Sequence, residues 1–149
     1  MRERIEAMKE IWTKDTAEYH GEFVNFPTMK TWPKPVQKPY PPIIVGVAFP
    51  HAARRSIRYG DGWVPIAGRA PKGDVNEYRP KFKQMVAEAG RSPDALPITL
   101  FGGAEDDDLL KQYRDMGVAR VVTTLPPEPA EKTLPVLDRW AEVIRKVNA

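Results

Sequence analysis

The chain has 149 residues, no cysteine, and 23 Lys and Arg against 20 Asp and Glu, which gives a net charge of +3. The lack of cysteine excludes disulfides and thiolate metal sites. Charges of both signs are interspersed, which is typical of a solvated surface and not of a nucleic-acid-binding patch. No apolar stretch approaches the roughly 18 residues of a membrane span, and residues 1–10 are too polar for a signal peptide. We therefore expect a cytoplasmic protein with no nucleic-acid or membrane partner.

The amino-terminal quarter predicts one helix, a short strand and an extended connector. Apolar side chains recur at helical spacing over residues 1–13. Residues 19–26 alternate apolar and polar around a glycine, which predicts a short strand or one arm of a hairpin. Residues 31–42 contain five prolines and are expected to be extended. A ligand for a proline-recognition domain is the alternative, but the segment leads directly into an apolar run, which favours a structural connector.

The rest of the chain is organised around residues 41–69, which read PPIIVGVAFPHAARRSIRYGDGWVPIAGR. The apolar run 43–45 predicts a strand buried on both faces, and residues 51–59 predict an amphipathic helix. Gly60 fits a left-handed C-cap, and residues 63–66 begin a second apolar strand. Strand, helix and strand form one βαβ unit, in which we expect the two strands to be parallel.

Further helices and strands alternate after this unit, in the order helix 75–89, strand 98–101, helix 105–116, strand 120–125 and helix 134–147. The three acids at 106–108 fit the positive end of a helix better than a metal cluster. His20 and His51 lie far apart, with no HExxH motif, and are weak evidence for a metal. Four βα units after an initial helix are predicted, with no domain boundary inside 1–149.

Several of these segments, taken in order, resemble the luciferase-like monooxygenase superfamily. They are the run PPIIVG, a turn with a small residue and a proline, a helix that contains AAR, and the motif YGDGW. The upstream motifs IW-T and GEF, and the segment WPKPVQKPYPP that overlaps the start of this region, are also similar to that family. The resemblance implies a (β/α)8 barrel and the use of FMN or deazaflavin coenzyme F-420 for hydride or oxygen transfer to a small organic substrate.

A complete (β/α)8 barrel needs roughly 250 residues. The expected fold is therefore a single half-barrel domain over 1–149, that is, a partial TIM barrel of about four parallel βα units preceded by an N-terminal helix. A non-catalytic remnant or binding module of the same fold is one alternative, and an unrelated small α/β protein is another.

Ligands of parallel α/β arrays lie at the carboxyl ends of the strands. After the first strand of the central unit, a glycine and a helix start offer free backbone N–H groups to a phosphate. By resemblance, two segments are assigned to cofactor binding, namely Gly46, Val47, Ala48 and Phe49, and Pro65, Ile66, Ala67, Gly68 and Arg69. A guanidinium at Arg69 suits a bidentate phosphate contact.

Each site assignment has a simpler alternative. The turn could be a tight βα connection that binds nothing, with the bulky Phe49 filling it, and Arg69 could be an unliganded loop residue. The catalytic residues stay unassigned, because such enzymes do their chemistry on the cofactor, and the protein supplies position and electrostatics.

A half-barrel leaves two unpaired strand edges and an open apolar face, both of which favour association. We therefore expect a homodimer, in which two copies would close one eight-stranded barrel. The strand residues expected to be exposed on the open face are Ile43, Val45, Trp63, Val64, Ile98, Leu100, Val121 and Val122.

Overall fold

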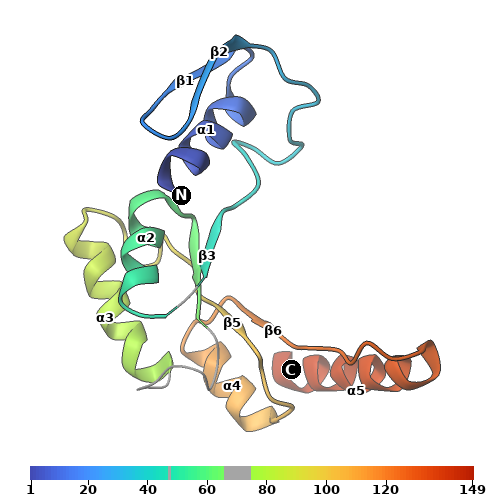
Figure 1. Ribbon diagram of the computed structural model, residues 1–149. Coiled ribbons are helices and arrows are strands. Elements are labelled where there is room, and N and C mark those ends of the chain that lie inside the picture. The colour runs from blue at the N-terminus through green and yellow to red at the C-terminus, as the bar shows by residue number, and fades with distance from the viewer. Residues whose placement is uncertain (47, 66–74) are drawn as a thin grey trace.

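The computed structural model describes residues 1–46, 48–65 and 75–149. Four βα units follow an amino-terminal helix and hairpin (Figure 1). In chain order the elements are α1 (Arg2–Thr13), β1 (Ala17–His20), β2 (Asn25–Met29), β3 (Ile44–Gly46), α2 (His51–Tyr59), β4 (Gly62–Val64), α3 (Val75–Glu88), β5 (Thr99–Phe101), α4 (Asp107–Asp115), β6 (Arg120–Val122) and α5 (Ala130–Asn148).

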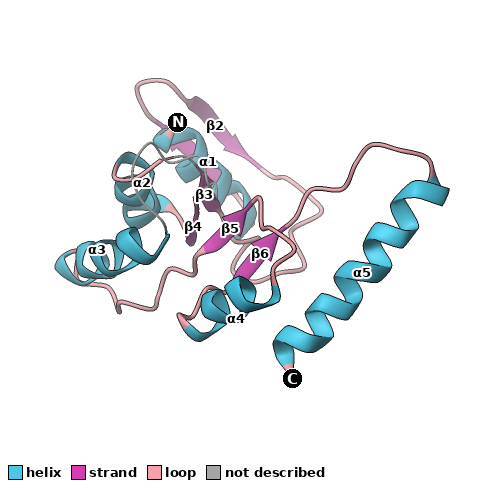
Figure 2. Cartoon of the chain, turned by 90° about the horizontal axis from the view of Figure 1, so that it is seen from below, coloured by secondary structure: helices cyan, strands magenta, loops and turns pink. Residues whose placement is uncertain are grey.

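The four strands after the hairpin are parallel and run in sequential order. β3 pairs with β4, and β5 pairs with β6. A parallel bridge between Trp63 and Ile98 joins the two pairs, and Trp63 N–H donates to the Pro97 carbonyl at 3.0 Å. The order β3-β4-β5-β6, with a helix after each strand, confirms the predicted half-barrel (Figure 2).

The helices pack against one face of these strands through a single large cluster of buried side chains. Trp63 of β4 is fully buried and its ring lies 4.8 Å from that of Phe82 in α3. Helix α2 buries its small residues Ala52 and Ala53 against the same cluster, which fits the stripe of small side chains in its sequence. Val143 of α5 is also a member, so every βα unit contributes to one core.

The sequence-based list of exposed residues includes residues from both faces of the strands, although only one face is open. Trp63, Ile98 and Leu100 are at most 4% exposed because they face the helices. Val45 is also buried, in a second cluster with Ile5 of α1 and Tyr59 of α2. That part of the prediction was wrong, because consecutive apolar residues do not reveal which of them point toward the helices. The open face instead carries the alternate positions along each strand.

The end of α2 also differs from the expectation. Gly60 has φ −93° and is extended, so the predicted left-handed C-cap is wrong. The Arg91 guanidinium instead donates to the carbonyls of Ile57, at 3.2 Å, and Gly60, at 3.4 Å. A Cβ atom at Gly60 would lie 2.8 Å from Val45 Cγ2 and 3.0 Å from Ser56 Cα. The glycine is therefore needed for close packing of α2 on β3.

The amino-terminal hairpin is held to α1 by two carboxylates. Glu3 accepts hydrogen bonds from the backbone N–H groups of Phe23, at 2.7 Å, and Val24, at 3.1 Å. Glu6 accepts from the Tyr19 hydroxyl at 2.6 Å, which raises the pKa of Tyr19 to about 12. The predicted strand at 19–26 is thus an antiparallel pair, β1 with β2, joined by a turn.

Candidate functional site

The predicted site lies at the carboxyl ends of β3 and β4. Gly46 is the last residue of β3, and Ala48 and Phe49 lead from it into α2. Pro65 follows β4, and its carbonyl accepts a hydrogen bond from Phe101 N–H of β5 at 3.0 Å. The fold therefore brings the described parts of the two predicted segments to the same end of the sheet. Of the nine predicted residues, Val47, Ile66, Ala67, Gly68 and Arg69 lie outside the described part of the chain.

The amino end of α2 is available to an anion. Its N-cap, Pro50, makes no side-chain capping hydrogen bond, and the first turn holds no acidic residue. The first helical hydrogen bond runs from Ala52 N–H to the Ala48 carbonyl at 3.1 Å. Pro50 has no N–H to donate, so this helix end acts mainly through its partial positive charge. This end of α2 faces the strand edge at which the predicted site lies.

The Phe49 side chain packs against two aromatic side chains. Its ring stacks on Tyr78 of α3, with centroids 5.0 Å apart, and lies 6.0 Å from the ring of the buried Trp63. The side chain therefore packs into the core on the helix side of the sheet.

Gly46 keeps space open beside that turn. A Cβ atom built on it would meet only Val64 Cγ1, at 3.7 Å, which is an ordinary van der Waals distance. Because Gly46 pairs with Val64 in register, the two residues point to the same face of the sheet. The missing side chain of Gly46 leaves room for a ligand to approach the backbone.

The neighbouring strand ends add residues that the sequence-based assignment left out. Phe101 at the end of β5 is 45% exposed despite its size. Gly102, with φ 90°, follows it, and the N–H groups of Gly102 and Gly103 both donate to the Val122 carbonyl. The position at a strand end was visible in the sequence, but the face on which Phe101 lies was not, because Phe101 follows another apolar residue, Leu100.

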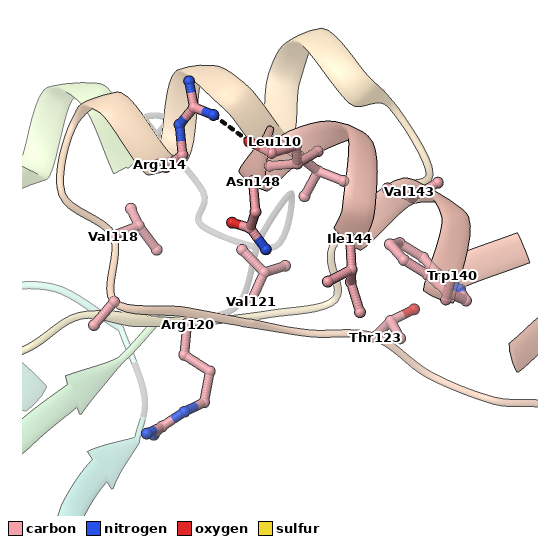
Figure 3. Close-up of a pocket in the computed structure, with 12 residues that line it drawn as sticks. Leu110, Arg114, Val118, Arg120, Val121, Thr123, Trp140, Val143, Ile144 and Asn148 are labelled. Carbon is pink, nitrogen blue, oxygen red and sulfur yellow. Dashed lines mark hydrogen bonds between the residues drawn. The ribbon is translucent and has the colours of Figure 1, made fainter.

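Two hollows elsewhere on the molecule do not coincide with this edge. One, of about 330 Å³, lies between α4, β6 and α5 and is lined mainly by apolar residues such as Leu110, Val121 and Ile144 (Figure 3). The other, of about 340 Å³, lies between the start of α1 and the outer side of α2, where Arg54, Arg55 and Arg58 line it. Both are on the helix side of the sheet.

Within 1–46, 48–65 and 75–149 no three His, Asp or Glu side chains come together as a metal site. None of the helices described there has the length and apolar character needed to cross a bilayer.

Comparisons with known proteins agree with the fold. The family model of luciferase-like monooxygenases matches residues 1–136. An uncharacterized protein of Mycobacterium tuberculosis is 35% identical over 143 residues, which are 95% of this chain and 49% of that protein. The chain thus spans about half the length of the curated relatives that match nearly all of its own length.

Two further relatives have names that state a cofactor. An F420-dependent glucose-6-phosphate dehydrogenase of Nakamurella multipartita is 27% identical over 64% of this chain and 28% of its own length. An FMNH(2)-dependent dimethylsulfone monooxygenase of Pseudomonas putida is 35% identical over 53% of this chain and 22% of its own. The crystal structure of monooxygenase RslO1 from Streptomyces bottropensis superposes with a TM-score of 0.71 at 18% identity, covering 99% of this chain and 60% of that one. This chain belongs to the luciferase-like monooxygenase family.

Proposed function

We propose that this chain supplies the phosphate-binding half of a barrel that uses FMN or deazaflavin coenzyme F-420 for hydride or oxygen transfer to a small organic substrate. The observation that carries the proposal is the uncapped amino end of α2, which lies at the carboxyl end of β3 with no acidic residue in its first turn. Relatives named for F420 and for FMNH(2) support a flavin-type cofactor in general.

The described residues fit a phosphate group in three ways. The helix end supplies partial positive charge. Gly46 leaves the approach open, and Phe49 is turned into the core. When bound, the cofactor would supply the redox chemistry, and this chain would hold its phosphate and orient its ring. Ala48 and Pro65 border this place on the two strand ends.

Arg69 is proposed as the cation that completes the phosphate site. A charge-assisted hydrogen bond contributes roughly 1.5–3 kcal/mol, and about 1.4 kcal/mol corresponds to one decade in affinity. Arg69→Ala should therefore weaken cofactor binding by about tenfold or more. The same replacement at Arg4, an exposed residue of α1, is the matched control and should leave the affinity unchanged.

The test is a titration with FMN and with coenzyme F-420, followed by quenching of cofactor fluorescence. Gly46→Ala gives an independent variant, because its methyl group is accommodated by the fold but narrows the approach to the turn. We expect reduced affinity with an unchanged melting temperature. Equal affinities for the wild type, Arg69→Ala and Gly46→Ala would contradict the proposed site. Absence of binding for both cofactors, with the barrel completed, would contradict the proposed function.

A further inference from the structure

The outer side of α2 carries a cluster of positive charge. Arg54, Arg55 and Arg58, the arginine cluster, are all exposed. None of the three guanidinium groups makes a hydrogen bond or an ion pair within the part of the chain that the structure describes, and α2 contains no acidic residue. Arg54 and Arg58 are four residues apart, and like charges at this spacing destabilise a helix. The stability of α2 therefore does not account for this arrangement.

Neighbouring carboxylates do not neutralise the arginine cluster. Asp61 follows α2, but its carboxylate accepts hydrogen bonds from Ile43 N–H, at 3.0 Å, and from the Tyr40 hydroxyl, at 3.4 Å. The acidic residues of α1 and α3, the helices that pack against α2, have partners of their own. These pairs are Glu3 with Phe23 and Val24, Glu6 with Arg2 and Tyr19, Glu10 with Lys14, Glu77 with Lys81, and Glu88 with Gln84. No described acidic residue of these helices is therefore left to pair with the cluster.

The arginine cluster lines a hollow and is not spread over a convex surface. The hollow has a volume of about 340 Å³, and Arg2 and Tyr59 also line it. It lies where the amino-terminal end of α1 approaches α2 (Figure 1). Its volume falls within the roughly 300–1,000 Å³ that is usual for sites of small ligands. The charge and the shape of this place therefore both suit a compact anion.

The chemistry of the cluster indicates which anion fits. The planar fork of a guanidinium group matches two oxygens of one phosphate, which gives short, charge-assisted hydrogen bonds. Three guanidinium groups on one short helix need an anion that carries several negative charges in a small volume. A chain of linked phosphates meets this requirement, whereas a single carboxylate does not. We propose that the hollow between α1 and α2 binds the diphosphate or triphosphate group of a small molecule through Arg54, Arg55 and Arg58.

This site is separate from the turn proposed to hold the cofactor phosphate. The arginine cluster lies on the outer side of α2, whereas that turn lies at the carboxyl end of β3. Binding at the hollow requires no flavin or deazaflavin, and it is measured without either. A failure of cofactor binding would therefore leave the proposed polyphosphate site standing, and the reverse also holds.

Isothermal titration calorimetry of the full chain tests the proposal, with inorganic pyrophosphate, inorganic phosphate and ADP as probes. Pyrophosphate should bind saturably with one site per chain, and phosphate at least about tenfold more weakly because it contacts fewer guanidinium groups. Tighter binding of ADP than of pyrophosphate would identify a nucleotide as the source of the diphosphate, and equal or weaker binding a diphosphate alone. Absence of saturable binding of both, or equal affinities for phosphate and pyrophosphate, would overturn the proposal.

Matched double variants separate a specific site from general charge attraction. Arg54→Gln combined with Arg58→Gln should weaken pyrophosphate binding at least about tenfold. Its melting temperature without ligand should not fall, because the variant removes a like-charge pair from the helix. Arg139→Gln combined with Arg145→Gln removes the same two charges from exposed positions of α5 and should leave the affinity unchanged. Equal weakening by the two double variants would show nonspecific attraction and overturn the proposed site.

A further variant locates the bound anion. Arg69→Ala should bind pyrophosphate as tightly as the wild type, because Arg69 is proposed to serve the cofactor turn. The single variant Arg54→Gln should weaken the binding on its own, which keeps the test valid if the double variant does not fold. Loss of pyrophosphate binding in Arg69→Ala, with normal binding in Arg54→Gln, would place the anion at the cofactor turn and contradict the proposed site.

Discussion

Glu3 shows how one buried carboxylate organises a segment that lacks much apolar packing. It is 8% exposed, and its carboxylate accepts hydrogen bonds from two backbone N–H groups of the hairpin turn. The hydrogen bond from Phe23 N–H is the main reason why the pKa of Glu3 lies below its ordinary value of 4.5, with a smaller contribution from Val24 N–H and an opposing one from burial. A carboxylate whose pKa is lowered by folding stabilises the fold only while it is ionised.

Acid should therefore release the hairpin from α1. The stabilisation by Glu3 is complete above its unfolded pKa near 4.5, and it is lost as the pH falls through the lower folded value. The exchange protection factors of the Phe23 and Val24 amides should fall in that range, and Glu3→Ala should remove this protection already at neutral pH. Glu142→Ala, on the exposed side of α5, is the control. Protection factors that do not change with acid in the wild type would contradict the assignment.

Ser56 is a buried residue whose side chain lowers the stability of the fold. It is completely buried on the inner side of α2, and its hydroxyl finds no hydrogen-bond partner among the described residues. Burial of an unpaired hydroxyl is unfavourable, and Ala is the better helix former. Ser56→Ala should raise the free energy of unfolding by about 0.5–1 kcal/mol in urea titrations. Ser92→Ala, at an exposed position, should have little effect, and a loss of stability at Ser56 would contradict the interpretation.

At the scale of elements, α4 depends on one capping side chain. The sequence placed its start at 105 with three acids in the first turn, whereas the helix begins at Asp107 and Asp106 precedes it as the N-cap. The Asp106 carboxylate accepts from Asp108 N–H at 3.1 Å and Leu109 N–H at 3.0 Å. These contacts satisfy two helix-end donors that would otherwise have no partner.

Asp106→Ala should therefore lower the free energy of unfolding by about 1 kcal/mol. Asp106→Asn should retain most of the stability because an asparagine side chain can accept the same hydrogen bonds. Asp138→Ala, at an exposed acid of α5, controls for the lost charge. Thermal unfolding would measure all three, and equal destabilisation by the Asn and Ala variants would exclude capping as the cause.

Helix positions were predictable from the sequence to within a few residues because helical periodicity is local. The helix predicted at 51–59 is α2 with the same bounds, and that predicted at 75–89 ends one residue earlier. Strand faces were not predictable, since Ile43, Ile44 and Val45 are all apolar and give no alternation. The orientation of Phe49 was equally hidden, because it depends on Tyr78, which lies 29 residues further along the chain.

The location of the candidate site was predictable from the sequence, but the exposure of its side chains was not. Resemblance and the strand-end rule located the turn at Gly46 and the loop after β4, and the fold brings the described parts of both to one edge. The exposure of Phe101 depends on the register between β5 and β6, which are separated in the sequence by α4. Such register is set by the tertiary fold and is not encoded in any local pattern.

At the scale of the whole molecule, stability is concentrated in the four βα units. The larger buried cluster joins β4, β5 and helices α2 to α5, whereas α1 contributes Ile5 to a small cluster with Val45 and Tyr59. The hairpin beyond α1 exposes Phe23 and Met29. Segments with few buried apolar contacts open at a lower free-energy cost than the core. The amino-terminal helix and hairpin should therefore exchange their amides before the parallel strands do.

Phe82 is the residue whose truncation should damage the larger cluster most directly. It is 1% exposed and packs on the fully buried Trp63, which itself bridges β4 to β5. Phe82→Ala should lower the free energy of unfolding by about 3–5 kcal/mol, through lost burial and the cavity that remains. Phe23→Ala, at a ring that is 80% exposed, should change it by less than about 0.5 kcal/mol. Denaturant unfolding followed by far-ultraviolet circular dichroism would compare the two variants, and similar midpoints for both would show that the cluster around Trp63 is not the stabilising core.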